Sequence, residues 1–147
     1  MPLDCFTTPV PPDYLRDESR KNGSAIAIAF PKSAHELTAA LKQTFSCGLP
    51  LTVQGSRTGI AAGAVPDGGL IINLSRMDAI LGSGTDTGTA APPTIRVQPG
   101  VSLVALRRHL TTAFPAHLFT PDPTETTASI GGMVACNASG ACSFAYG

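Results

Sequence analysis

Two short apolar runs, residues 25–30 and 51–54, stand on either side of a helical pattern, and this order constrains the fold more than any other feature. The length of the first run favours a buried strand over a helix. Between the runs, Ser33 and Glu36 have the spacing of a capping box, and the helical pattern ends at Gly48. These segments predict a β-α-β unit whose two strands pair in parallel through a right-handed crossover.

Further segments extend the pattern along the chain. A third apolar run, residues 70–72, follows a Pro-Asp-Gly-Gly turn, and residues 94–98 alternate as a strand. Ser102 begins a helix with leucines on one face, and Arg107 is expected on its solvated face. Residues 82–93 consist of Gly, Ser, Thr, Ala, Asp and Pro, a composition that predicts a mobile insertion.

Charge and composition exclude several classes of function. Ten Lys and Arg balance ten Asp and Glu, so no basic footprint for nucleic acid exists. No apolar run approaches the roughly 20 residues of a membrane span, and the N-terminus lacks the pattern of a signal peptide, so we expect a cytoplasmic protein. The four cysteines form no CxxC pair and have no histidine at ligand spacing, so we expect no metal site.

A glycine-rich loop, Gly55-Ser56-Arg57-Thr58-Gly59, follows the second apolar run. Glycines let such a loop turn successive backbone N–H groups toward an anion such as a pyrophosphate. The hydroxyl groups of Ser56 and Thr58 can add donors, and Arg57 could reach a phosphate. The fingerprints GxGxxG and GxxxxGK[ST] are both absent. An ordinary tight turn is the alternative interpretation of this loop.

A second candidate region is the stretch from Pro121 to Gly140. A loop rich in Pro and Thr leads to Ser129, which can cap a helix that we expect to end near Gly140. The paired glycines at positions 131 and 132 permit close approach of a flat ligand or a phosphate, and free N–H groups at a helix start favour negative charge. Tight packing of the helix is the alternative explanation for the glycines.

Taken in order, these segments resemble the FAD-binding domain of the vanillyl-alcohol oxidase/p-cresol methylhydroxylase (PCMH) superfamily, nearest to the D-type subunit of glycolate oxidase and to D-lactate dehydrogenase-like proteins. The matching text covers nearly the whole chain and consists of Asp17-Glu18-Ser19, Phe30-Pro31 with Glu36-Leu37, Pro50 to Gly59, Asn73-Leu74-Ser75-Arg76-Met77, Val97-Gln98-Pro99-Gly100-Val101, Pro121-Asp122-Pro123 and Ser129-Ile130-Gly131-Gly132 to Asn137-Ala138-Ser139-Gly140. The resemblance implies an α+β, PCMH-type FAD-binding fold, incomplete here: a small β-α-β subdomain with parallel strands, followed by part of a second mixed sheet with flanking helices.

The same resemblance implies FAD as the cofactor, with its pyrophosphate held by the backbone amides of Gly55 to Gly59. The residues that it places along the ribityl chain and the isoalloxazine are Pro99, Gly100, Pro121, Asp122, Ser129, Ile130, Gly131, Gly132, Asn137 and Gly140. It also implies hydride transfer to the flavin from a 2-hydroxy acid of the glycolate or D-lactate type. An electron-transfer partner subunit is a further possibility in this family.

The family continues well beyond the position of Gly147. We therefore expect an N-terminal arm, residues 1–22, followed by a C-terminally truncated FAD-binding domain, residues 23–147. The chain is expected to lack the residues that hold and oxidise a substrate, and to be inactive alone. Cys142 and Ala145 stand where relatives tend to carry basic residues. The alternative is a non-catalytic remnant of the fold, or a module that binds another nucleotide or phosphate.

Overall fold

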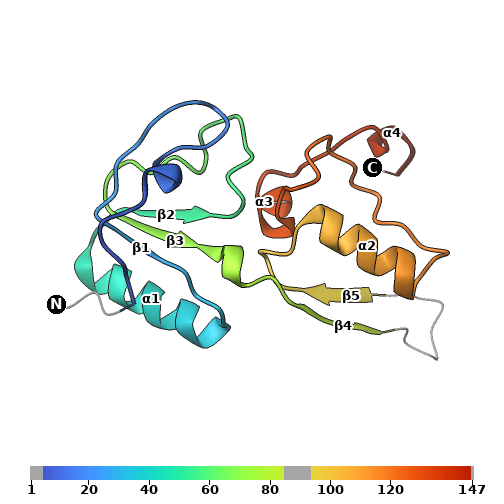
Figure 1. Cartoon of the computed structure of the whole chain (residues 1–147), viewed down its shortest axis with the longest axis horizontal. Helices are drawn as coiled ribbons and strands as arrows, with labels where there is room; N and C mark the ends of the chain where they lie inside the picture. Colours follow the sequence, from blue (N-terminus) through green and yellow to red (C-terminus); the bar gives the residue numbers. More distant parts are fainter. Residues whose placement is uncertain (1–4, 85–93, 147) are drawn as a thin grey trace. The chain divides into compact units, whose positions relative to one another are not determined.

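The computed structural model describes residues 5–84 and 94–146. The chain divides into two units, Met1–Met77 and Asp78–Gly147. The first unit contains a parallel sheet and the second a two-stranded antiparallel sheet, each with its own helices (Figure 1). The α+β class is therefore as predicted.

The first unit is built on three parallel strands, β1 (Ala27–Ala29), β2 (Leu51–Gln54) and β3 (Leu70–Asn73). The order across the sheet is β1-β3-β2, so β3 lies in the centre and pairs with both neighbours. The three strands were predicted, but the expectation that the first two pair directly was wrong. β1 and β3 are buried along their whole length, which explains why both read as continuous apolar runs.

Helix α1 (Ala34–Cys47) packs on one face of this sheet (Figure 1). Its predicted ends are confirmed: the Ser33 side chain accepts a hydrogen bond from the N–H of Glu36 at 3.2 Å, and Gly48 ends the helix with a φ of 63°. Ala40 is buried against β1 and β3, and its small side chain lets the helix lie close to the strands. The helix thereby stabilises the sheet, and the glycine-rich loop follows the carboxyl end of its strand β2.

Part of the predicted arm folds onto this unit. Thr7 forms an antiparallel bridge with Ile28 of β1, through backbone hydrogen bonds of 2.7 and 3.1 Å. The short 3-10 helix η1 (Pro12–Leu15) follows. The chain then returns along the turn before β3, where Gly23 packs so closely on Pro66 that a Cβ would lie 1.9 Å from the Pro66 carbonyl oxygen. Residues 12–24 are thus held beside the segment that connects β2 to β3.

The second unit pairs β4 (Ile80–Gly84) with β5 (Thr94–Val97) in antiparallel fashion. Helix α2 (Leu103–Ala113) begins at its predicted cap, Ser102, and packs its leucine face on the strands. The mobile insertion predicted for residues 82–93 was wrong for residues 82–84, which belong to β4, because pairing with β5 satisfies their backbone without requiring apolar side chains. The rest of that prediction, residues 85–93, lies outside the described residues.

Helix α3 (Ile130–Ala135) ends earlier than expected, five residues before Gly140. Asn137 takes the left-handed conformation, with a φ of 47°, and the N–H groups of Asn137 and Ala138 return to the carbonyls of Val134 and Met133. This is the Schellman arrangement, in which Asn is the second choice after Gly. A short helix, α4 (Ser143–Tyr146), follows.

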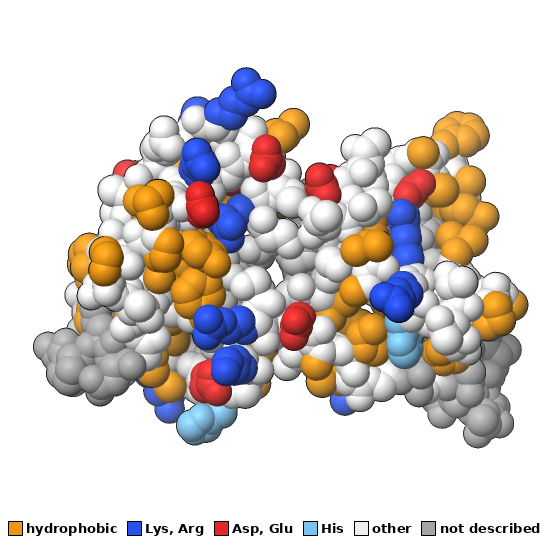
Figure 2. Space-filling view, viewed as in Figure 1, with side chains coloured by type: hydrophobic (Ala, Val, Ile, Leu, Met, Phe, Trp, Pro, Cys, Tyr) orange, Lys and Arg blue, Asp and Glu red, His pale blue; other side chains and the backbone are white. Residues whose placement is uncertain are grey.

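Basic and acidic side chains are mixed over the face shown in Figure 2. Among the described residues, no helix has the length and apolar character needed to cross a membrane.

Candidate functional site

The glycine-rich loop leaves the carboxyl end of β2, the edge of a parallel sheet where ligands commonly bind. In the part of the chain that the structure describes, none of the backbone N–H groups of residues 56–63 donates a hydrogen bond to a protein acceptor. Residues 56–63 are half-buried or exposed, so these N–H groups are accessible to a ligand, and a run of accessible N–H groups at such an edge is a property of anion-binding nests. The loop therefore fits a pyrophosphate.

The left-handed residues of this loop are not its glycines. Arg57 has a φ of 62° and Ala62 a φ of 60°, whereas neither Gly55 nor Gly59 has a positive φ. The expectation that glycine supplies the unusual backbone conformation here was therefore wrong. A left-handed residue with a side chain costs roughly 1–2 kcal/mol, and such residues concentrate at functional sites. Gly59 contributes space instead, since nothing lies within 4 Å of the position its Cβ would take.

Two buried amide side chains lie directly beneath the loop. Gln54 and Asn73 end β2 and β3 and are partners in the strand register. The Nε2 group of Gln54 donates to the carbonyls of Tyr14 and Ala64, at 2.8 and 2.7 Å. The Nδ2 group of Asn73 donates to the carbonyl of Gly55, at 3.2 Å, and to the side-chain oxygen of Gln54. Both ends of the loop are thus tied to the sheet.

The segment that follows η1 supports the loop from outside. The carboxylate of Asp17 accepts hydrogen bonds from the N–H groups of Ser19 and Ala64, and the N–H of Glu18 donates to the Arg57 carbonyl at 3.3 Å. Burial would raise the pKa of Asp17, but the hydrogen bonds from Ser19 and Ala64 outweigh it and lower the pKa. Asp17 is therefore held as a carboxylate beside the far end of the loop.

The guanidinium group of Arg57 lies over the ring of Tyr14, 4.2 Å from its centre. Tyr14 meets Phe30 edge to face, and the guanidinium group of Arg76 lies over the Phe30 ring, 4.9 Å from its centre. This stacking accounts for the position of Arg57 through a cation–π contact. Contact of its side chain with a phosphate remains a prediction.

In the second unit, two pairs of predicted residues come together. The N–H of Gly131 donates to the Pro99 carbonyl at 2.8 Å, so the turn at Pro99 and Gly100 lies against the start of α3. Gly140 lies against Asp122, since a Cβ on Gly140 would be 1.7 Å from the Asp122 carbonyl oxygen. The structure thus brings predicted residues together in both places, and their contact with a cofactor stays a prediction.

The start of α3 differs from expectation in one respect. The N–H groups of Ile130, Gly131 and Gly132 donate to Val101, Pro99 and the side chain of the cap, Ser129. No free N–H group remains there for an anion, so the expectation of free donors at this helix start was wrong. The missing side chain of Gly131 is explained by packing, because a Cβ would lie 2.6 Å from the Pro99 side chain. Approach of a flat ring to this backbone stays a prediction.

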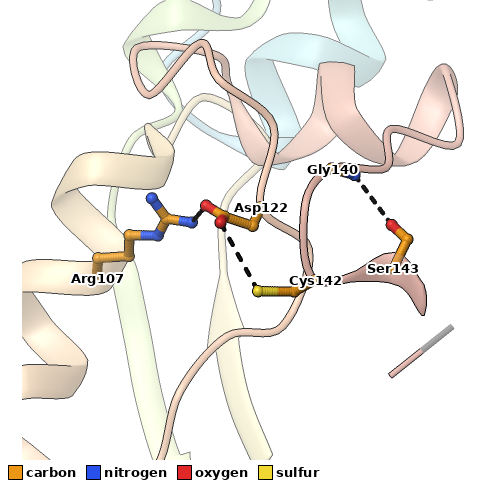
Figure 3. A network of polar contacts seen from close by, with 5 residues as sticks. All are labelled: Arg107, Asp122, Gly140, Cys142 and Ser143. Atoms are coloured by element: carbon orange, nitrogen blue, oxygen red, sulfur yellow. Dashed lines mark hydrogen bonds and ion pairs between the residues drawn. The ribbon is translucent and has the colours of Figure 1, made fainter. Parts of the chain in front are cut away.

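Asp122 forms the polar network that Figure 3 shows. Its carboxylate is paired with Arg107 of α2 and accepts a hydrogen bond from the Cys142 thiol, with a separation of 3.7 Å. The expectation that Arg107 simply faces solvent was therefore wrong, because the loop at Asp122 folds back onto α2. The N–H of Gly140 donates to the Ser143 hydroxyl at 2.9 Å, which holds the turn that presents Cys142. A cavity of about 340 Å³ opens beside this network.

Sequence reasoning overlooked Gln54, Asn73, Asp17 and Arg107 as residues of these sites. Gln54 and Asn73 had a visible signal, since each is a polar amide at the end of an apolar strand, where a side chain must find internal partners. The roles of Asp17 and Arg107 depend on contacts between segments far apart in the sequence, which no local pattern reveals.

Residues 25–147 match the family model of the FAD binding domain. This match covers most of the chain and defines the class of the protein, and the chain belongs to this family of FAD-binding domains. FAD is thus the cofactor that the sequence predicted.

Relatives and solved structures agree with this assignment. The chain is 34% identical to an FAD-linked oxidoreductase of Mycobacterium tuberculosis, 33% to a D-lactate dehydrogenase of Anaerostipes hadrus and 34% to glycolate oxidase subunit GlcD of Escherichia coli K12. These matches cover 94%, 92% and 83% of this chain but only 29%, 28% and 23% of the relatives. The structure of alkyldihydroxyacetonephosphate synthase shares the fold, with a TM-score of 0.71 at 20% identity over 87% of this chain and 23% of that one.

Proposed function

We propose that this chain is the part of a flavin-dependent oxidoreductase that holds FAD, and that the complete enzyme acts on a 2-hydroxy acid of the glycolate or D-lactate type. The observation that supports the cofactor role is the run of unpaired N–H groups at residues 56–63. The substrate class rests on relatives that are named as a D-lactate dehydrogenase and as a subunit of glycolate oxidase. A cytoplasmic location and an electron-transfer partner subunit belong to the same proposal.

In this proposal, the loop binds the pyrophosphate through its backbone. The N–H groups of residues 56–59 would donate to the phosphate oxygens, and the hydroxyl groups of Ser56 and Thr58 would add donors. No lysine is needed, because oriented backbone N–H groups supply the positive field. When bound, the flavin supplies the acceptor for the hydride that leaves the hydroxyl-bearing carbon of the substrate.

Residues of the second unit are assigned to the remainder of the cofactor. Pro99 and Gly131 are assigned to the ribityl chain and the ring by the resemblance, and the hydrogen bond between them would hold the two segments together there. Asp122, fixed by Arg107 and lying against Gly140, would define one side of the ring site. The remaining residues of this set are Gly100, Pro121, Ser129, Ile130, Gly132 and Asn137.

The variant Gly59→Val tests the loop. Because the space around Gly59 is open and its φ is not positive, a valine should fold normally, yet it would stand in the path of the phosphate. The affinity for FAD can be measured by titration, followed through the amide resonances of residues 56–63. We expect it to fall at least about tenfold, because the variant would lose a few backbone hydrogen bonds to the phosphate.

The matched control is Gly84→Val, which alters an equally open glycine in β4 of the second unit. It should bind FAD as the wild type does. Equal affinity of the Gly59→Val protein would contradict the assignment of the loop. If ADP shifts the same amides and binds as tightly as FAD, the loop belongs to a general nucleotide-binding module, which is the alternative function.

A further inference from the structure

Gln54 and Asn73 are polar side chains in a place where apolar ones would suffice. They are 1% and 0% exposed, at the ends of two adjacent apolar strands. Burying an amide is unfavourable unless its polar atoms find partners, and removing one partner leaves a costly unsatisfied group. Here both amide groups use both of their N–H bonds, and the Asn73 side-chain oxygen accepts from the N–H of Ser75 at 3.0 Å. The arrangement is a complete network.

Three of the acceptors in this network are main-chain carbonyls that surround the loop. Gly55 is the first residue of the glycine-rich loop, Ala64 directly follows the unpaired run of residues 56–63, and Tyr14 belongs to the segment that packs beside the loop. The network therefore does not brace the sheet itself, whose strands are already paired through their backbones. It fixes where the loop starts and where it ends.

Fixing these carbonyls also fixes the direction of N–H groups. In a planar trans peptide, the C=O of one residue and the N–H of the next point in opposite directions. Because the Gly55 carbonyl points toward Asn73, the N–H of Ser56 points away from the sheet interior. The Arg57 carbonyl likewise accepts from Glu18, so the N–H of Thr58 is directed away from that contact.

We infer that Gln54 and Asn73 are positioning residues that pre-organise the N–H groups of the loop for a pyrophosphate. This rests on the proposed function and names the residues that make its loop competent. A loop that is already ordered loses less freedom when the ligand binds, so its affinity is higher. The two amides act through the backbone of the loop and have no role that requires contact with the cofactor.

Two variants remove the donors without adding charge. Gln54→Met frees the carbonyls of Tyr14 and Ala64, and Asn73→Leu frees the carbonyl of Gly55. Both variants also break the hydrogen bond between the two amides, and only Asn73→Leu frees the N–H of Ser75, so the Thr44→Val control below is needed to separate the effect on the loop from general destabilisation. We expect each variant to weaken FAD binding about tenfold, because one or two buried hydrogen bonds are lost. The amide resonances of the loop should also broaden.

Thr44→Val is the matched control, because it removes a hydrogen bond of 3.0 Å from a side chain of the same unit that is 4% exposed, but on α1. It should lower thermal stability and leave FAD affinity within about twofold, since it touches no part of the loop. If both network variants bind FAD as the wild type does, the inference is overturned.

A measurement on the wild-type chain does not depend on whether the variants fold. Without FAD, the backbone amides of residues 56–63 should have order parameters near those of the strands, about 0.85, despite lacking protein acceptors. Values below about 0.6 would show a flexible loop and overturn the inference. A rigid loop whose amides do not respond to FAD would instead overturn the proposed function and, with it, the cofactor role of this pair.

Discussion

Arg57 carries the left-handed turn of the loop at a position where glycine would be less strained. Arg57→Gly and Arg57→Ala both remove the guanidinium from Tyr14, but only Gly relieves the backbone. If binding depends on the backbone, both variants should retain FAD affinity within about threefold, whereas Arg57→Gly should be more stable than Arg57→Ala by the roughly 1 kcal/mol that separates the two residues in this conformation. Equal and large losses in isothermal titration would instead show that the guanidinium itself contacts the cofactor.

Asp17 gives the first unit a pH dependence of defined sign. Its pKa is lowered in the folded state, because the hydrogen bonds from Ser19 and Ala64 outweigh the effect of burial. The ionised group therefore stabilises the fold above its unfolded pKa of about 3.9, and this stabilisation is lost as the pH falls through the folded value. We expect the wild type to melt about 3 °C above Asp17→Asn at neutral pH, a difference of roughly 1 kcal/mol, and the gap to close in strong acid.

The control for this series is Asp13→Asn, at an exposed carboxylate that pairs with Arg16. Exposed ion pairs contribute little, so its melting temperature should stay close to that of the wild type. A gap between wild type and Asp17→Asn that stays constant with pH would show that shape rather than charge matters at Asp17.

At the scale of elements, local signals and long-range pairing were predictable to different degrees. The caps at Ser33 and Ser102 and the stop at Gly48 followed from chemistry within one turn of helix, and all three are present. The central position of β3 did not follow, because parallel strand order is decided by packing of the whole sheet. Residues 82–84 of β4 were missed because Gly-Ser-Gly carries no strand pattern of its own, and this part of the strand is defined by its pairing with β5.

The start of α3 allows its two glycines to be told apart. A Cβ on Gly131 would lie 2.6 Å from the Pro99 side chain and 3.0 Å from its carbonyl, whereas on Gly132 it would meet only the Ser129 hydroxyl, at 3.0 Å. We expect Gly131→Ala to destabilise the protein by about 1–3 kcal/mol through overpacking. Gly132→Ala should be nearly neutral, because a gain of about 1 kcal/mol in helix propensity offsets a small displacement of the cap. Thermal denaturation that ranks the two variants equally would contradict this packing.

At the scale of the whole molecule, each unit carries its own set of candidate residues. The order of motifs predicted the cofactor. In the structure, hydrogen bonds and close packing from neighbouring residues hold the loop, the turn at Pro99 and the contact of Asp122 with Gly140. Their supports were not predictable, because Gln54, Asn73 and Arg107 act on segments between 10 and 40 residues away along the chain, such as Ala64 and Tyr14 for Gln54. Sequence patterns report what a segment forms, and only the fold shows what holds it in place.

A polypeptide of these 147 residues should respond to FAD without oxidising a 2-hydroxy acid by itself. Oxidation of a 2-hydroxy acid requires the reacting carbon to be held against the flavin in a fixed geometry, and that requirement is separate from holding the pyrophosphate. The contacts proposed for the loop would serve only the second task. The matches cover 23% to 29% of the three relatives, which are named as an oxidoreductase, a D-lactate dehydrogenase and a subunit of glycolate oxidase. With FAD, an artificial electron acceptor, and either D-lactate or glycolate, we expect FAD-dependent shifts of the loop amides but no turnover above that of free FAD. The D-lactate dehydrogenase of Anaerostipes hadrus serves as the positive control in the same assay. Turnover above the free-flavin background, abolished by Gly59→Val, would show that these residues also bring the substrate to the ring.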